Sequence, residues 1–250
     1  MILGIGSGDS AVKTLGLRPT GLARMREQLG TLRTLLDGEA ADFEGRSLSV
    51  EAAGGRGRVP VYLAATGPKM QALAGEVADG VIVVTGLEPE LVRATLERIG
   101  AGAEQGGRTV EELDVCFGTY AHVTSDRAEA ARIVKPYVVA TAQTGGQELL
   151  HGLGIHIDPP EVVGGIYPDM SHAVDWDAAC DASEEWVSDE QALVYADAFC
   201  LIGAPGEIAD RLERAAAAGA RSFYIRHFGS YTLPHELLRT FAETVLPRFA

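Results

Sequence analysis

Short apolar runs alternate with amphipathic stretches along most of this chain. Five short runs are rich in apolar residues, and the one over residues 81–85 is apolar throughout, which is typical of a strand buried on both faces of a parallel sheet. We expect these strands at residues 2–6, 59–65, 81–85, 114–123 and 222–227. Between them, apolar residues recur at steps of three and four, which indicates helices that cover the sheet. The alternation of strand and helix predicts an α/β fold.

Caps and breakers indicate where several of the helices begin and end. The apolar stripe over residues 22–36 stops before Gly38, a residue suited to a helix C-terminus. Pro68 is suited to the first turn of the next long helix. Ser125 is expected to cap a helix that continues to about Thr141.

Two segments interrupt the alternation. Residues 43–53 are predicted to form a hairpin that turns at Glu44-Gly45-Arg46. Residues 145–198 are rich in acidic residues and lack a clear period, so we interpret them as an insertion of loops and short helices. The run 202–205 then opens another helix.

The strand count conflicts with the length of the chain. The 250 residues would permit a whole (β/α)8 barrel, but only five strands are predicted. Two interpretations follow from the pattern alone. Either three βα units of a barrel are missing, or the fold is an open doubly wound sheet.

Composition and charge exclude several classes of protein. A hydrophobic fraction of 46% is that of a globular domain and not of a disordered chain. No apolar run reaches the roughly 18 residues that a membrane helix needs, and the N-terminus has no secretory signal pattern. With 35 acidic against 21 basic residues, the net charge of −14 disfavours nucleic acid and anionic membranes as partners.

The three cysteines and the acidic residues do not form a recognisable metal site. Cys116, Cys180 and Cys200 are widely spaced and form no Cys-x-x-Cys motif, which favours reduced thiols in a cytoplasmic protein. The carboxylates between residues 169 and 190 are interpreted as a solvated face. We therefore expect no metal centre.

Three motifs, taken in their order and spacing, resemble a known family. They are Leu3–Asp9 (LGIGSGD), Val61–Lys69 (VYLAATGPK) and Ala74–Val81 (AGEVADGV). Together they resemble the bacterial luciferase-like oxidoreductases, in particular the deazaflavin-dependent branch that includes methylenetetrahydromethanopterin reductases. Residues 14–17 also resemble those reductases, and the resemblance extends from residue 3 to residue 249.

This resemblance implies a TIM barrel of the (β/α)8 family. Relatives carry an insertion after the seventh strand, which matches residues 145–198, and their first motif lies on the fourth strand. The chain is then one domain over residues 1–250, an incomplete barrel with about five βα units and an insertion after the fourth strand present. We expect strands 2–6 and 222–227 at opposite edges. Exposed edges favour a homo-oligomer or a further chain that supplies the missing units.

The resemblance also implies a cofactor site at the carboxyl ends of the strands. Glycines in the first motif would let a planar ring approach the backbone. The end of the second motif lies before a helix N-terminus, where phosphate binds readily. Lys69 would add positive charge there, although each segment is also compatible with an ordinary turn. The implied cofactor-binding residues are Gly6, Ser7, Gly8, Ala64, Ala65, Thr66, Gly67, Thr85 and Gly86.

Two residues are candidates for proton transfer. In related sugar-phosphate dehydrogenases a glutamate occupies the position of Asp9, so the resemblance implies an acid or an orienting carboxylate there. The alternative is that Asp9 caps a turn. His227 either acts as an acid or base near neutral pH or covers the barrel mouth. Tyr120 and His122 are weaker candidates for contact with substrate.

The implied function is hydride transfer between coenzyme F420, or FMN, and a small organic substrate. The resemblance places Leu87 and Ala198 at two positions that carry cationic residues in the sugar-phosphate dehydrogenases. Since neither residue is charged, a sugar phosphate is disfavoured as the substrate. Two alternatives stay open. One is a flavin-dependent monooxygenase that uses dioxygen, and the other is a non-catalytic fragment or subunit of the same fold.

Overall fold

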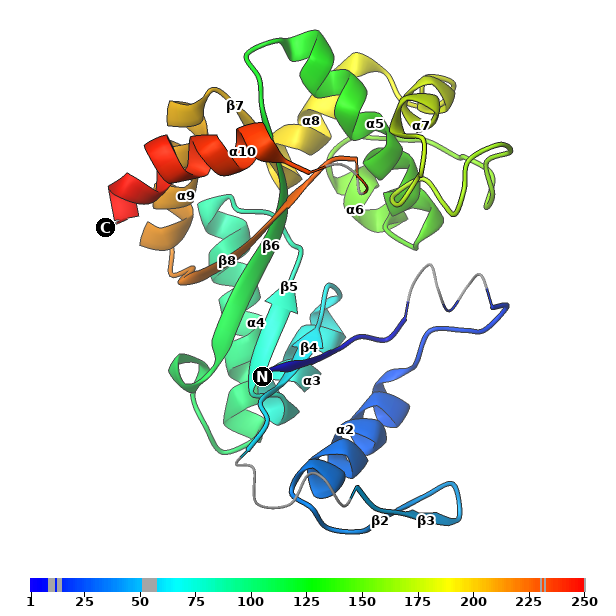
Figure 1. The fold of residues 1–250 in the computed structure, drawn as a ribbon, viewed down its shortest axis with the longest axis vertical. Helices are drawn as coiled ribbons and strands as arrows, with labels where there is room; N and C mark the ends of the chain where they lie inside the picture. The colour runs from blue at the N-terminus through cyan, green and yellow to red at the C-terminus, as the bar shows by residue number, and fades with distance from the viewer. Residues whose placement is uncertain (9–11, 13–14, 51–57, 230, 232, 250) are drawn as a thin grey trace. The chain divides into compact units, whose positions relative to one another are not determined.

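The computed structural model describes residues 1–250 except 9–11, 13–14, 51–57, 230, 232 and 250. The chain forms two compact units (Figure 1). Unit 1 contains residues 1–85, 90–117 and 219–222, and unit 2 contains residues 86–89, 118–218 and 223–250. Strand β6 (Asp114–Val123) contributes its first half to unit 1 and its second half to unit 2.

Unit 1 is built on parallel strands. They are β1 (Leu3–Ile5), β4 (Val61–Ala64), β5 (Gly80–Val83) and the first half of β6. In their register, Ile5 lies beside Leu63, and Ala64 lies beside Ile82. The four expected strands are confirmed: β1 and β4 are shorter than predicted, β5 begins one residue earlier and ends two earlier, and β6 has the predicted bounds.

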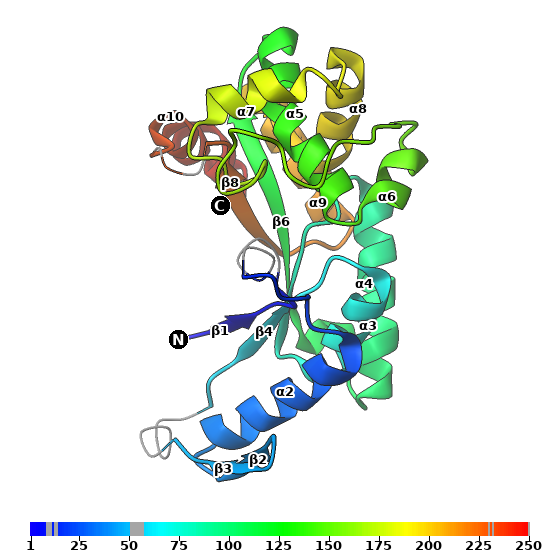
Figure 2. The same cartoon turned by 90° about the vertical axis from the view of Figure 1, so that its right-hand side faces the viewer.

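Three helices and a short 3₁₀ turn complete unit 1. They are α2 (Leu22–Leu36), α3 (Pro68–Val77), α4 (Pro89–Gln105) and η1 (Val110–Glu112). Figure 2 shows α3 and α4 on one side of β4, and α3 contacts both β4 and β5. The expected place of Pro68 in the first turn of α3 is confirmed. The predicted apolar stripe of α2 buries Met25 and Leu29.

The predicted hairpin after α2 is confirmed. Strands β2 (Ala41–Phe43) and β3 (Arg46–Leu48) pair in antiparallel fashion. Glu44 and Gly45 have φ angles of 52° and 73°. A two-residue hairpin turn requires positive φ at both positions when its twist matches that of the flanking strands. The end of the predicted segment, residues 51–53, lies outside the described residues.

Helices α3 and α4 approach each other at glycines. A Cβ on Gly102 would lie 1.9 Å from the carbonyl oxygen of Ala72, and one on Gly75 would lie 2.0 Å from the carbonyl oxygen of Ile99. Gly106 meets the Glu76 carbonyl in the same way, at 2.6 Å. Each neighbour is backbone and not a flexible side chain, so only glycine fits at these positions.

The Ala74–Val81 motif has a structural explanation. Asp79 accepts a hydrogen bond from the Val61 amide at 2.9 Å and forms ion pairs with Arg33 and Arg58. Gly80 leaves room for the Tyr62 ring, which would lie 2.5 Å from a Cβ there. This motif therefore joins α2, β4 and β5, and its role in unit 1 is to hold β4 and β5 in register.

Unit 2 contains the second half of β6 with β7 (Cys200–Gly203) and β8 (Ser222–His227). In the described residues β7 pairs with β6 in parallel, and β8 also pairs with β6. Strand β8 has the predicted bounds, whereas β7 adds a sixth strand to the five that we predicted. Its helices are α5 (Arg127–Gln143), α6 (Gln147–Gly152), α7 (Trp176–Ser183), α8 (Asp189–Phe199), α9 (Pro205–Ala217) and α10 (His235–Thr240), followed by single turns at Phe241–Val245 and Leu246–Phe249.

Residues 145–198 consist of loops and short helices, as predicted, and their interpretation as an insertion stays a prediction. Helices α6, α7 and α8 lie within or at the end of residues 145–198. They contribute to one buried core with α5, which contacts both α7 and α8. The acid-rich segment therefore has an apolar inner side even though its sequence shows no continuous helical period.

The predicted cap of α5 is wrong by one residue. The N-cap is Asp126, whose carboxylate accepts hydrogen bonds from the amides of Ala128 and Glu129. Ser125 precedes the cap. Both residue types cap helices well, and an aspartate at this position also gains from the positive end of the helix dipole.

Candidate active site

The first and second motifs of the sequence end side by side in unit 1. Strands β1 and β4 are parallel neighbours, so the segments after Ile5 and Ala64 leave the sheet at the same edge. A Cβ on Gly6 would lie 3.5 Å from the Ala64 Cβ, which is ordinary contact. Gly6 and Ala64 are both exposed. The structure thus brings together two of the three predicted cofactor-binding segments.

The N-terminus of α3 opens at this edge. Thr66 and Gly67 are exposed, and the N-cap residue Gly67 has no side chain with which to cap the helix. A Cβ built on Gly67 meets no atom within 4 Å. The first turn of α3 carries no acidic residue and includes the exposed Lys69. The amides of Met70 and Gln71 donate to the Gly67 carbonyl, so the attraction for an anion at this place comes from the helix dipole and the Lys69 cation.

The side chain of Gln71 holds the turn at Thr66 through a hydrogen bond, a role that the sequence did not indicate. Its side chain is 1% exposed, and its Nε2 donates to the Thr66 carbonyl at 2.8 Å. Its Oε1 is buried without a hydrogen-bond partner among the described residues. Such an acceptor next to the turn suits a ligand that brings an N–H or O–H group.

The glycine-rich segment after β1 is held in shape by its neighbours. The Ser7 carbonyl accepts from the Thr20 amide at 2.7 Å. Gly8 has a φ of +94°, and a Cβ there would lie 2.3 Å from a methyl group of Val12. Only glycine satisfies both conditions. Asp9, the predicted acid, lies outside the described residues.

Thr85 and Gly86 differ from the other candidates. The Thr85 hydroxyl is 3.0 Å from the hydroxyl of Thr95, a residue of α4 that is 1% exposed. Gly86 is buried and has a positive φ of 87°. The hydroxyl of Thr85 is therefore used within unit 1, and Thr95 is a partner that sequence reasoning missed.

In unit 2, the imidazole ring of His227 is oriented by the backbone carbonyl of the next residue, Phe228. Its Nδ1 lies 2.7 Å from the Phe228 carbonyl oxygen, so Nδ1 carries the proton and donates it. Nε2 is then an acceptor. His122 instead interacts with Glu129 through Nε2 at 3.0 Å. Glu129 also accepts from the Thr124 hydroxyl, and these two hydrogen bonds lower the pKa of its carboxyl group.

The cysteines are unsuited to nucleophilic chemistry. Burial raises the pKa of the Cys180 thiol to about 11 and that of Cys200 to about 12. Burial also raises the pKa of Cys116. All three are free thiols, and at neutral pH they are protonated, whereas the reactive form of cysteine is the thiolate.

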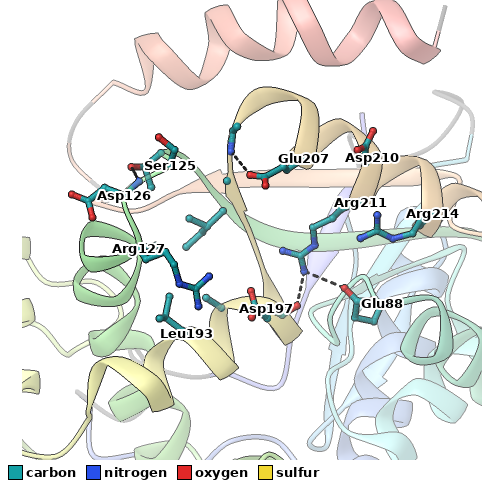
Figure 3. Close-up of a pocket in the computed structure, with 16 residues that line it drawn as sticks. Glu88, Ser125, Asp126, Arg127, Leu193, Asp197, Glu207, Asp210, Arg211 and Arg214 are labelled. Carbon is teal, nitrogen blue, oxygen red and sulfur yellow. Dashed lines mark hydrogen bonds and ion pairs between the residues drawn. The ribbon is translucent and has the colours of Figure 1, made fainter.

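A cavity of about 620 Å³ lies within unit 2, between α5, α8 and α9 (Figure 3). Arg211 and Glu88 form an ion pair in it at 3.4 Å. The carboxylate of Glu207 accepts from the Ala204 amide, and Asp126 caps α5. Since these charges have partners within the protein, we assign the cavity no chemical role.

Within the described part of the chain, no helix is long and apolar enough to cross a membrane. Across the same residues, no group of three or more histidine, cysteine, aspartate or glutamate side chains is arranged to hold a metal ion.

Residues 1–222 match the family model described as luciferase-like monooxygenase. The chain is 30% identical over 231 residues to a 5,10-methylenetetrahydromethanopterin reductase of Archaeoglobus fulgidus, which covers 87% of this chain and 64% of that protein. It is 34% identical over 140 residues to an F420-dependent glucose-6-phosphate dehydrogenase of Nakamurella multipartita, covering 52% of this chain and 41% of that one. The chain thus spans less than two thirds of the length of either relative.

The fold is similar to that of a solved relative. The coenzyme F420 dependent tetrahydromethanopterin reductase from Methanopyrus kandleri superposes with a TM-score of 0.64 at 20% identity, over all of this chain and 74% of that one. This likeness confirms the α/β fold of an incomplete TIM barrel. It excludes the open doubly wound sheet that the strand pattern alone had allowed. Taken with the family model, these findings show that the chain belongs to the luciferase-like monooxygenase family.

Proposed function

We propose that this protein is an oxidoreductase that transfers a hydride between coenzyme F420 and a small organic substrate. The observation that carries the proposal is the open N-terminus of α3 at Gly67, beside the glycine segment at the end of β1. Named relatives of this family use F420. Lys69 and the N-terminus of α3 support a phosphorylated, flavin-like cofactor at this place by their positive charge.

The cofactor's phosphate would bind at Thr66, Gly67 and the first turn of α3. The amide groups there have no side-chain cap, and Lys69 adds a positive charge. Gly6 lets a flat group approach the backbone, because it carries no Cβ and is exposed. When bound, the deazaflavin supplies or accepts the hydride, and the protein orients it and excludes water.

Two side chains are the proposed groups for proton transfer. Asp9 follows the glycine segment directly, so it is the proposed acid or orienting carboxylate near the cofactor. His227 is the second candidate, because its Nδ1 donates to the Phe228 carbonyl and leaves Nε2 as an acceptor. A neutral imidazole in this tautomer is able to take a proton from a hydroxyl group.

A second function has support from the family model, whose description is that of a monooxygenase. The same edge of unit 1 would then hold FMN, which also carries a phosphate. When bound, reduced FMN would supply two electrons to dioxygen, so that one oxygen atom enters the organic substrate and the other leaves as water. The two functions differ in the cofactor and in the consumption of oxygen.

An assay with the full chain separates the two functions. The chain is mixed with F420 and with either methylenetetrahydromethanopterin or glucose 6-phosphate, the compounds in the names of its relatives. A series of small alcohols and carbonyl compounds follows. Hydride transfer predicts a change in the visible absorbance of F420 without uptake of oxygen.

The outcomes are distinct. Oxygen uptake with reduced FMN, and none of these reactions with F420, would replace hydride transfer by monooxygenation. Absence of both reactions and of any cofactor binding would leave the chain as a non-catalytic member of the family. The sugar phosphate is expected to be the poorer substrate, since the uncharged Leu87 and Ala198 stand where the sugar-phosphate dehydrogenases carry cationic residues.

A further inference from the structure

An arginine in unit 2 lies against a cluster of aromatic rings. The Tyr120 and Tyr137 ring centroids are 4.0 Å apart, and Tyr137 lies 5.2 Å from Trp176 and 5.4 Å from Phe228. The guanidinium carbon of Arg226 is 4.0 Å from the centre of the Tyr120 ring. The same guanidinium lies 6.0 Å from the ring of Tyr224. We call these six residues the Arg226 cluster.

Three polar atoms of the Arg226 cluster are buried without hydrogen-bond partners. They are Tyr137 Oη, Trp176 Nε1 and Arg226 Nε. Tyr137 is 6% exposed, and its hydroxyl interacts electrostatically with the Tyr120 phenol and the Arg226 guanidinium but makes no hydrogen bond of good geometry. Buried polar atoms in native proteins nearly always pair with protein groups, ordered water or a ligand, so three such donors in one cluster form a concentrated set of hydrogen-bonding groups.

The positive charge of Arg226 is also uncompensated. In unit 2, Arg132, Arg211 and Arg248 each pair with a carboxylate. The other described arginines of unit 2 without an ion pair are exposed, whereas Arg226 is half-buried. No aspartate or glutamate among the described residues forms an ion pair with Arg226, although the chain has 35 acidic residues. A partly buried guanidinium stacked on a ring, with no anion beside it, is an arrangement that suits recognition of an anionic ligand.

The orphaned atoms are mostly donors. An indole Nε1 and a guanidinium Nε only donate, and burial raises the pKa of both Tyr120 and Tyr137, which keeps these phenols protonated. The ligand must therefore bring acceptor oxygens. One cation in apolar surroundings neutralises one negative charge, so a carboxylate fits better than a doubly charged phosphate.

We propose that the Arg226 cluster binds the carboxylate of a ring-bearing organic acid. Arg226 would hold the two carboxylate oxygens, which match the fork of its N–H groups. Tyr137 and Trp176 would donate the remaining hydrogen bonds. The surrounding rings favour an aromatic acid over an acyclic one, because a ring buries apolar surface against them. The inference does not depend on the identity of the redox cofactor.

The fluorescence of Trp176 reports binding directly. The chain has two tryptophans, and Trp186→Phe leaves Trp176 as the only one. In this background we titrate the full chain with benzoate, with its neutral analogue benzamide, and with inorganic phosphate. Benzoate is expected to change the emission in a saturable way. Benzamide and phosphate are expected to bind at least about tenfold more weakly.

Matched arginine variants assign the effect. Arg226→Gln is expected to weaken benzoate binding by about tenfold or more, and Arg226→Lys by less, since lysine keeps the charge without the fork. Arg214→Gln on α9 is the control and is expected to bind as the parent does. If Arg226→Gln does not fold, as judged by circular dichroism, Arg226→Lys and the benzamide comparison decide. Equal binding of benzoate and benzamide, a preference for phosphate, or no saturable binding would overturn the proposal.

Discussion

Replacing Gly102 by alanine is expected to lower the free energy of unfolding by about 3 kcal/mol. The added Cβ would lie 1.9 Å from the Ala72 carbonyl oxygen, and backbone has no alternative rotamer through which to move away. Helices α3 and α4 would have to separate, and buried apolar contacts around Ile99 would loosen. Urea unfolding followed by circular dichroism measures the change as a lower midpoint.

Gly30 provides the matched control. It lies on the exposed side of α2, and a Cβ there meets no atom within 4 Å. Alanine has the higher helix propensity, so Gly30→Ala is expected to stabilise the chain by about 0.5–1 kcal/mol. A Gly102→Ala variant with the midpoint of the parent chain would show that the two helices do not pack at this glycine.

Replacing Asp9 by asparagine is expected to lower turnover by about 100-fold, the usual effect of losing a general acid. Asparagine keeps the size of the side chain but does not exchange a proton at this position. Cofactor affinity should change little, because the proposed phosphate site is at Thr66 and Gly67. Steady-state turnover is measured with whichever substrate of the assay series the parent chain accepts.

Asp42→Asn on the exposed face of β2 is the control for this substitution and is expected to leave turnover unchanged. If Asp9→Asn turns over at the rate of the parent chain, Asp9 is a turn residue and the acid must be sought elsewhere. His227→Gln is then the next variant to measure, since its Nε2 is an acceptor with a fixed tautomer.

The hydrophobic pattern predicted the five main strands because each is a short run rich in apolar residues between helical stretches. It missed β7, since Cys200–Gly203 directly follows α8 and is too short to show a period of its own. The choice between Ser125 and Asp126 as the cap of α5 was equally open to sequence reasoning. Both are good caps, and only the hydrogen bonds to Ala128 and Glu129 identify the one that is used.

The candidate site was partly predictable for a similar reason. Parallel pairing of two apolar strands implies that the segments at Gly6 and Ala64 emerge together, and the register confirms it. The roles of Gln71 and Thr95 were not predictable. Both are helix residues that look like ordinary surface positions, and their burial depends on how α3 and α4 pack in three dimensions.

The most direct test of the proposed cofactor site is a fluorescence titration of F420 with the full chain and two variants at Thr66. Thr66→Glu places a negative charge at the N-terminus of α3, and Thr66→Gln is its neutral match in size. The account predicts saturable binding by the parent chain, similar binding by Thr66→Gln, and binding at least about tenfold weaker for Thr66→Glu through charge repulsion. No saturable binding by the parent chain, or equal affinity of the two variants, would contradict it.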